Sequence, residues 1–93
     1  MPYNSGQRSA VAVADGVTRV IRQYARVIPS TMAITPDLEL LEAGVDSMTL
    51  VEIIAGLEVE FDCTFPDGML ILDIFRTPAS IASTVIGLMS GAS

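Results

Sequence analysis

The sequence predicts an all-α protein: a small four-helix bundle with a long loop between its first and second helices and a short third helix. Three observations predict this class. Apolar residues recur at helical spacing in three segments, and no segment sustains the period of two that is typical of strands. Prolines stand where helices are expected to begin or end. The 93 residues are 51% hydrophobic, which suffices for one small core and one domain.

The first helix is expected over about residues 9–28. One face carries apolar residues at the i, i+3, i+4, i+7 and i+11 positions: Val17, Val20, Ile21, Tyr24 and Ile28. Three arginines fall on the opposite side: Arg19, Arg22 and Arg26. Pro29 helps to end this helix because its ring cannot continue the helical hydrogen bonds.

The connection that follows is long for a compact domain, and such loops are uncommon unless they carry function. Three leucines are expected to pin it to the bundle: Leu38, Leu40 and Leu41. The sequence TPDLELLEAG can include a helical turn, with Thr35 as its cap, Pro36 at its first position and Gly44 as its terminator.

The second helix is expected over about residues 47–60 and has two apolar faces. The core face consists of Leu50, Ile53, Ile54, Leu57 and Phe61. The outer stripe consists of Met48, Val51, Ala55 and Val59, with Glu52 and Glu58 on its flanks. An apolar outer face edged by acids is typical of a docking surface. We therefore predict partner binding by Met48, Val51, Glu52, Ala55 and Glu58; the alternative is that the stripe packs under the first loop or the third helix.

The segment MLILDIF is expected to form the short third helix or an irregular apolar plug, after a turn in DCTFPDG. The last helix has Thr77 as its cap and Pro78 at its first position, with Ile81, Val85 and Leu88 on its inner face. We expect a flexible N-terminal tail over residues 1–8, one folded domain over residues 9–89 and a flexible C-terminus over residues 90–93.

Missing residue types exclude several classes of protein. The chain has no histidine and one cysteine, Cys63, so it cannot form a disulfide framework, a Cys/His zinc site or a Cys–His nucleophilic pair within itself. With no histidine or lysine and with scattered carboxylates, an enzyme is not expected. No secretory signal and no membrane-spanning apolar run are evident, and we predict a cytoplasmic location.

The formal net charge of −6 is unevenly distributed. Residues 1–36 carry four arginines and one aspartate, a net charge of +3, whereas residues 37–93 carry ten acids and one arginine, a net charge of −9. The acidic part argues against nucleic acid as a partner and favours partners with basic surfaces. The alternative is that the acidic residues serve only solubility. This explains why the net charge is negative, but it does not explain why the positive and negative charges lie in different parts of the chain.

Two residues that can cap a helix, Asp46 and Ser47, stand together at the start of the second helix. Asp46 can cap through its carboxylate and also complement the positive end of the helix dipole. The hydroxyl of Ser47 is then free at the mouth of the helix. No base lies near Ser47 in the sequence, so a catalytic nucleophile is not expected there.

The stretch LLEAGVDSMTLVEIIAGLEVEF resembles the signature of the phosphopantetheine-binding carrier proteins, the acyl and peptidyl carrier family. Seven residues fall at matching places without a gap: Gly44, Asp46, Ser47, Glu52, Leu57, Glu58 and Phe61. The FPDG turn and the FRTPASIA entry to the last helix match as well, so the resemblance covers about residues 9–89. It implies that this domain is a carrier domain with a four-helix bundle of the acyl-carrier type.

The resemblance further implies that a transferase attaches 4′-phosphopantetheine from coenzyme A to Ser47, and that the thiol of this arm holds acyl or aminoacyl groups as thioesters. Asp46 would lie beside the phosphate and help to place the transferase's metal ion, or would only cap the helix. The protein would be a non-catalytic monomer without a metal of its own and without nucleic acid or membrane partners. Its expected partners are a phosphopantetheinyl transferase and loading, condensing and modifying enzymes with basic docking surfaces.

Several residues depart from the pattern of fatty-acid carriers. Met48 replaces the usual leucine after the serine, and Thr49 and Val59 stand where fatty-acid carriers often have acids. The stretch between Phe61 and Thr77 is also longer than theirs. These departures favour a free-standing carrier in polyketide or nonribosomal peptide biosynthesis over a fatty-acid synthesis carrier. A small helical adaptor in which Ser47 only caps a helix is the alternative from a different class.

Overall fold

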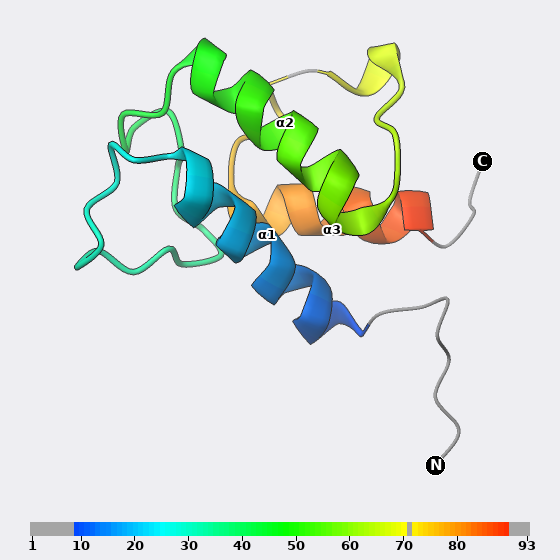
Figure 1. Ribbon diagram of the computed structural model, residues 1–93, viewed down its shortest axis with the longest axis horizontal. Coiled ribbons are helices and arrows are strands. Elements are labelled where there is room, and N and C mark those ends of the chain that lie inside the picture. Colours follow the sequence, from blue (N-terminus) through cyan, green and yellow to red (C-terminus); the bar gives the residue numbers. More distant parts are fainter. Residues whose placement is uncertain (1–8, 71, 90–93) are drawn as a thin grey trace.

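The computed structural model describes residues 9–70 and 72–89, and within them it contains helices and turns but no strand. Its α-helices are α1 (Ala10–Tyr24), α2 (Ser47–Phe61) and α3 (Pro78–Met89), and a short 3-10 helix spans Asp67–Met69. Helix α1 packs against both α2 and α3. Figure 1 shows α1 and α2 running side by side, with α3 lying across their direction. The all-α prediction is confirmed, while the predicted tails over 1–8 and 90–93 lie outside the described residues.

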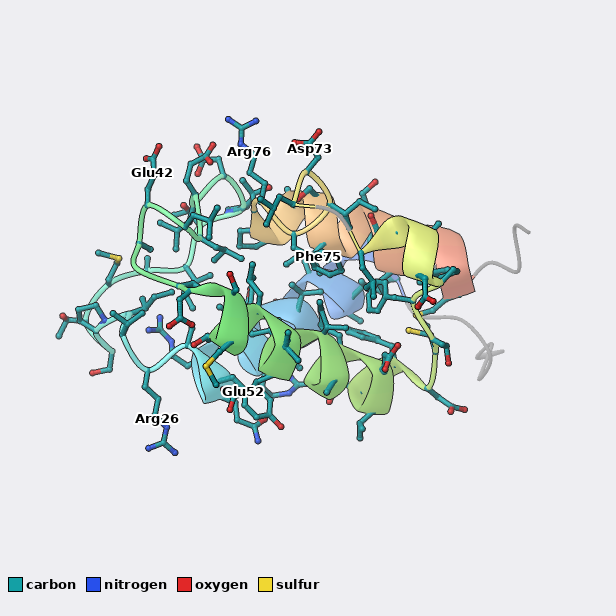
Figure 2. The ribbon with its side chains drawn as sticks, turned by 90° about the horizontal axis from the view of Figure 1, so that it is seen from above. Arg26, Glu42, Glu52, Asp73, Phe75 and Arg76 are labelled. Atoms are coloured by element: carbon teal, nitrogen blue, oxygen red, sulfur yellow. The ribbon has the colours of Figure 1, made fainter. Side chains whose placement is uncertain are left out.

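The bundle has three α-helices in its described part rather than the four that the sequence predicts. The expected third helix over residues 69–75 is replaced by the 3-10 helix and a turn in which the amide of Phe75 donates to the carbonyl oxygen of Leu72 at 3.1 Å. The reason is tertiary: Phe75 is buried and its ring meets that of Phe65 edge to face, with centroids 5.3 Å apart. Figure 2 places Phe75 inside the bundle. The described part of the segment is therefore irregular, as in the alternative prediction, but only Phe75 is buried, while Leu70 and Leu72 are exposed.

Helix α1 ends at Tyr24, four residues before the predicted end. The guanidinium of Arg22 donates to the carbonyl oxygens of Pro29 at 2.9 Å and Met32 at 2.7 Å, so the chain folds back over the last helical turn. Ile28 is still buried, although it lies outside the helix. The start is set locally, because the side chain of Ser9 caps the helix by accepting from the amide of Ala12 at 3.1 Å.

The helical periodicity identified the core correctly. The buried side chains include most of the predicted faces of the three helices: Val17, Val20, Ile21, Leu50, Ile53, Leu57, Phe61, Ile81 and Val85. Tyr24, Ile54 and Leu88 are partly buried against this core. One prediction is wrong: Leu41 is 49% exposed, whereas Leu40 is fully buried and Leu38 is partly buried against the core.

The second half of the loop is fastened to the start of α3. The amide of Leu40 donates to the carbonyl oxygen of Arg76 at 3.0 Å, and the amide of Ala79 donates to that of Pro36 at 2.9 Å. The Nε of Arg76 also pairs with the carboxylate of Glu39 at 2.9 Å. These contacts hold the chain just before α2, which fixes where that helix begins.

The predicted helical turn is present, but it is shorter than expected. The amide of Ala43 donates to the carbonyl oxygen of Glu39 at 2.9 Å, and Gly44 ends the turn in the left-handed region, with φ of 102°. Thr35 does not cap this turn. Its carbonyl oxygen accepts from the amide of Leu38 at 3.1 Å, so Thr35 and Pro36 belong to a separate turn.

Candidate functional site

The start of α2 is capped by Asp46, as the sequence predicts. Asp46 has extended backbone angles, with φ of −98° and ψ of 178°, and its Oδ1 accepts from the amide of Thr49 at 2.9 Å. The hydrogen bonds from Thr49 hold the pKa of Asp46 below its ordinary value. The carboxylate is therefore charged at neutral pH, where it also complements the positive end of the helix dipole.

Ser47 is the first residue of α2, and its side chain is exposed. The Ser47 hydroxyl has no hydrogen bond within residues 9–70 and 72–89. It is not needed as a helix cap, because Asp46 already accepts the hydrogen bond from the amide of Thr49. The amides of Ser47 and Met48 have no acceptor inside the helix, as at any helix start. A phosphate ester on Ser47 would stand at this positive end, which suits an anion. The chemistry of the position therefore fits a phosphopantetheine arm.

Buried residues on both sides hold Ser47 in place. Val45 and Leu50 are buried, and the amide of Val45 donates to the carbonyl oxygen of Leu40 at 3.0 Å. Gly44 lies beneath Val27: a Cβ added at Gly44 would come within 3.0 Å of a methyl group of Val27. Glycine is needed here both for its positive φ and for this close contact. The exposed hydroxyl thus stands on a rigid support.

The outer stripe of α2 is open to solvent in the described structure. Met48 is 79% exposed, Val51 is 64% exposed and Val59 is 83% exposed, and Ala55 and Glu52 are also exposed. The alternative prediction, in which the stripe packs under the first loop or the third helix, is therefore wrong for the described residues. An exposed apolar stripe beside Ser47 is available to a partner.

Two other glutamates of α2 are used inside the fold. The Oε2 of Glu58 accepts from the amide of Phe65 at 2.9 Å, and the carboxylate of Glu60 pairs with Arg19 of α1 at 2.7 Å. Glu58 is one of the predicted partner-binding residues, and this internal contact was not predicted. Phe65 is seven residues from Glu58 in the sequence, and Arg19 is 41 residues from Glu60. No short-range sequence pattern could therefore reveal either contact.

Several other charged side chains extend from two opposite edges of the molecule. Figure 2 shows Glu42, Asp73 and Arg76 extending from one edge and Arg26 from the opposite one. Two of the three arginines of the predicted stripe have internal roles, since Arg19 pairs with Glu60 and Arg22 binds the loop carbonyls.

Other kinds of site find no support in the described part of the chain. No group of three or more His, Cys, Asp and Glu residues is placed to hold a metal ion among these residues. Within them, no helix is long and apolar enough to span a membrane. Partial burial, reinforced by the charges of Glu58 and Asp62, raises the pKa of the Cys63 thiol, which keeps it protonated at neutral pH.

Comparison with known proteins identifies the family. The family model described as phosphopantetheine attachment site matches residues 15–85. The chain belongs to this family of phosphopantetheine-binding carrier proteins. Its cofactor is covalently attached 4′-phosphopantetheine, and the protein is a non-catalytic carrier that is itself a substrate of partner enzymes. Carriers of this kind interact with phosphopantetheinyl transferases and with biosynthetic enzymes.

Two curated relatives share part of the sequence. The aminoacyl carrier protein of Agrobacterium fabrum (strain C58 / ATCC 33970) is 25% identical over 75 residues, which cover 81% of this chain and 90% of the relative. Aminoacyl carrier protein 1 of Bradyrhizobium diazoefficiens is 30% identical over 53 residues, which cover 57% of this chain and 59% of the relative.

Proposed function

We propose that the arm is attached to Ser47, and that this carrier holds aminoacyl or acyl groups for the assembly of a polyketide or nonribosomal peptide. One observation supports the attachment site above all others. The Ser47 hydroxyl is exposed at the first position of α2, and no described hydrogen bond occupies it. A transferase can therefore reach the nucleophilic oxygen without disturbing the helix cap.

Each neighbouring group has a distinct part in this proposal. Asp46 keeps the helix closed up to its first residue, so that Ser47 is presented on a fixed backbone. The free amides at the helix start favour the negative charge of the phosphodiester. When bound, the arm supplies a thiol that carries the cargo as an activated thioester. The protein tethers this cargo, which raises its effective concentration at each partner enzyme.

An aminoacyl cargo is favoured over a fatty-acyl cargo. Both curated relatives are named aminoacyl carrier proteins. In addition, Thr49 and Val59 stand on α2 where fatty-acid carriers often have acids. The alternative of a helical adaptor assumes that Ser47 only caps α2. This assumption is not met, since Asp46 caps α2.

Arm attachment can be tested by intact mass. Incubation with coenzyme A, magnesium and a broad-specificity phosphopantetheinyl transferase is expected to add the mass of one arm to the wild-type protein. Ser47→Ala is expected to gain nothing while keeping its helical circular dichroism. Ser83→Ala is the matched control, because Ser83 is an exposed helical serine away from this site. An arm on the Ser47→Ala variant would sink the assignment.

The cargo can be tested on the protein that carries the arm. We expect an aminoacyl group to be loaded as a thioester, which hydroxylamine removes. For comparison, fatty-acid synthase enzymes are given the same arm-bearing protein and a fatty acid under the same conditions. If those enzymes load and elongate the fatty acid as efficiently as on their own carrier, the proposal of specialised assembly is wrong.

A further inference from the structure

We propose that Glu39 and Arg76 are positioning residues, and that their ion pair holds Ser47 in the place where a transferase modifies it. This inference rests on the proposed attachment of the arm to Ser47. It gives the segment just before α3 a role in a reaction that takes place at the start of α2. It follows from the geometry of the pair and from the hydrogen bonds that connect it to the entry of α2.

The ion pair joins the long loop before α2 to the segment before α3. The Nε of Arg76 donates to both carboxylate oxygens of Glu39, at 2.9 Å to Oε1 and at 3.1 Å to Oε2. The carboxylates of Asp73 and Glu42 also attract this guanidinium. Figure 2 shows Glu42, Asp73 and Arg76 extending from the same edge of the molecule. One arginine therefore holds three acids together, and without it these acids repel one another.

Backbone hydrogen bonds lead from this pair to Ser47. The amide of Leu40 donates to the carbonyl oxygen of Arg76 at 3.0 Å, and the carbonyl oxygen of Leu40 accepts from the amide of Val45 at 3.0 Å. Leu40 and Val45 are both buried. Val45 is followed by Asp46, which caps α2, and then by Ser47. A shift of Leu40 relative to Arg76 therefore moves the part of the chain that carries Ser47.

The pair matters more for local order than for the stability of the whole protein. Both side chains are partly exposed, at 62% for Arg76 and 34% for Glu39. An exposed ion pair shifts an equilibrium by about fivefold or less, because water competes for both charges. This shift is small compared with the equilibrium constant of global unfolding. It is large enough to change how often a surface loop opens, because such openings need little free energy.

A second ion pair, between Arg19 and Glu60, provides a matched control. The side chain of Arg19 is 62% exposed, the same fraction as that of Arg76, and its Nη2 lies 2.7 Å from the Oε2 of Glu60. Glu60 lies about 20 Å along α2 from Ser47. Removing this pair therefore removes a similar contact far from the proposed attachment site.

Amide hydrogen exchange, followed by NMR, measures the local opening without any enzyme. In Arg76→Gln, the amides of Leu40 and Val45 are expected to exchange about twofold to fivefold faster than in the wild type. Arg76→Glu also adds repulsion among the acids, and about tenfold faster exchange is expected. In Arg19→Gln, both amides are expected to keep their wild-type rates. The amide of Leu57, in the core, reports on opening of the whole fold and is expected to change less than these two amides in both Arg76 variants.

Initial rates of arm attachment at saturating coenzyme A test the consequence for the reaction. A misplacement of about 1 Å at a reacting group can lower a rate by about 100-fold, so a loosely held Ser47 affects kcat more than KM. We expect kcat to fall about threefold in Arg76→Gln and about tenfold in Arg76→Glu, with KM for the carrier changed less than about twofold. Arg19→Gln is expected to match the wild type.

A charge swap distinguishes positioning from direct contact with the transferase. In the double variant Glu39→Arg/Arg76→Glu, the pair can form again with its charges exchanged. We expect this variant to recover kcat to within about twofold of the wild type, and to slow exchange at Leu40 and Val45 again. A side chain that contacts the enzyme directly is not rescued in this way, because its charge toward the enzyme stays reversed.

The outcomes separate the inference from the proposed function. If the wild-type protein gains no arm, the proposed function fails and this inference fails with it. If the wild type is modified but Arg76→Gln behaves like Arg19→Gln, only the positioning inference is overturned. It is also overturned if KM changes instead of kcat, if the charge swap does not restore kcat, or if the amide of Leu57 accelerates as much as that of Val45. Thermal melts verify that each variant is folded, and Arg76→Gln keeps the test decisive if charge reversal unfolds the chain.

Discussion

The crossing of α1 and α2 depends on glycines, and Gly16→Ala tests how close the two helices lie. A Cβ added at Gly16 would come within 2.6 Å of the Cζ atom of Phe61 and 3.1 Å of its Cε1 atom. Carbon atoms in contact normally lie about 3.5–4.0 Å apart, so the ring or the helix must shift by about 1 Å. Phe61 is 5% exposed and has little room to move.

Two opposing effects determine the size of the change. Alanine normally stabilises a helix interior relative to glycine by up to about 1 kcal/mol. Overpacking of a filled core costs about 1–3 kcal/mol. The net expectation is that Gly16→Ala lowers the free energy of unfolding by roughly 1–2 kcal/mol. In a domain of this size each kcal/mol corresponds to roughly 4–8 °C in melting temperature.

Gly87→Ala is the matched control, since a Cβ there would have nothing within 4 Å. The same substitution on α3 is therefore expected to stabilise the protein by about 0.5–1 kcal/mol. Urea denaturation followed by circular dichroism gives both changes from the midpoints and slopes. If Gly16→Ala is as stable as the wild type while Gly87→Ala is stabilised, the helices do not approach closely at Gly16, and the packing described above is incorrect.

Two further predictions concern the core and the helix cap. Leu57→Ala is expected to lower the free energy of unfolding by about 2–5 kcal/mol, because Leu57 is fully buried, while Leu72→Ala at a 62% exposed leucine is expected to change it by less than about 0.5 kcal/mol. Equal losses in urea melts would contradict the assigned core. The pKa of Asp46 is lower in the folded state than its ordinary value of 3.8. The ionised Asp46 carboxylate therefore stabilises the fold fully above pH 3.8, and this stabilisation is lost as the pH falls through the lowered pKa of the folded state. Asp46→Ala is therefore expected to be less stable than the wild type at neutral pH, and the gap is expected to shrink in acid; a gap that does not depend on pH would contradict the charged cap.

The sequence predicted those parts of the fold that depend on neighbours along the chain. The faces of α1, α2 and α3 follow the helical repeat, so residues such as Ile21, Leu57 and Ile81 were identified as buried. The caps of α2 and α3 were also predicted, because a capping side chain binds an amide three residues further along, whereas the predicted cap at Thr35 is wrong and the Ser9 cap of α1 was not predicted. Asp46 binds the amide of Thr49 at 2.9 Å, and Thr77 binds that of Ser80 at 3.1 Å.

The features that could not be predicted depend on contacts between distant residues. The early end of α1 follows from the bonds of Arg22 to carbonyls seven and ten residues away. The loss of the third helix follows from the packing of Phe75 against Phe65. At the site, the sequence identified the exposed stripe of α2 but not the internal contact of Glu58. Such contacts are set by the tertiary arrangement, for which a local pattern carries no signal.

The most direct test of the central claim is to locate the arm within the chain after enzymatic attachment. Trypsin cleaves after arginine, and the chain has no lysine, so one peptide extends over residues 27–76 and contains two serines, Ser30 and Ser47. Fragmentation of this peptide by tandem mass spectrometry separates the two positions. The arm is predicted on Ser47, with none on Ser30 or on any other peptide. An arm on Ser30, or on a peptide outside residues 27–76, would contradict the assignment.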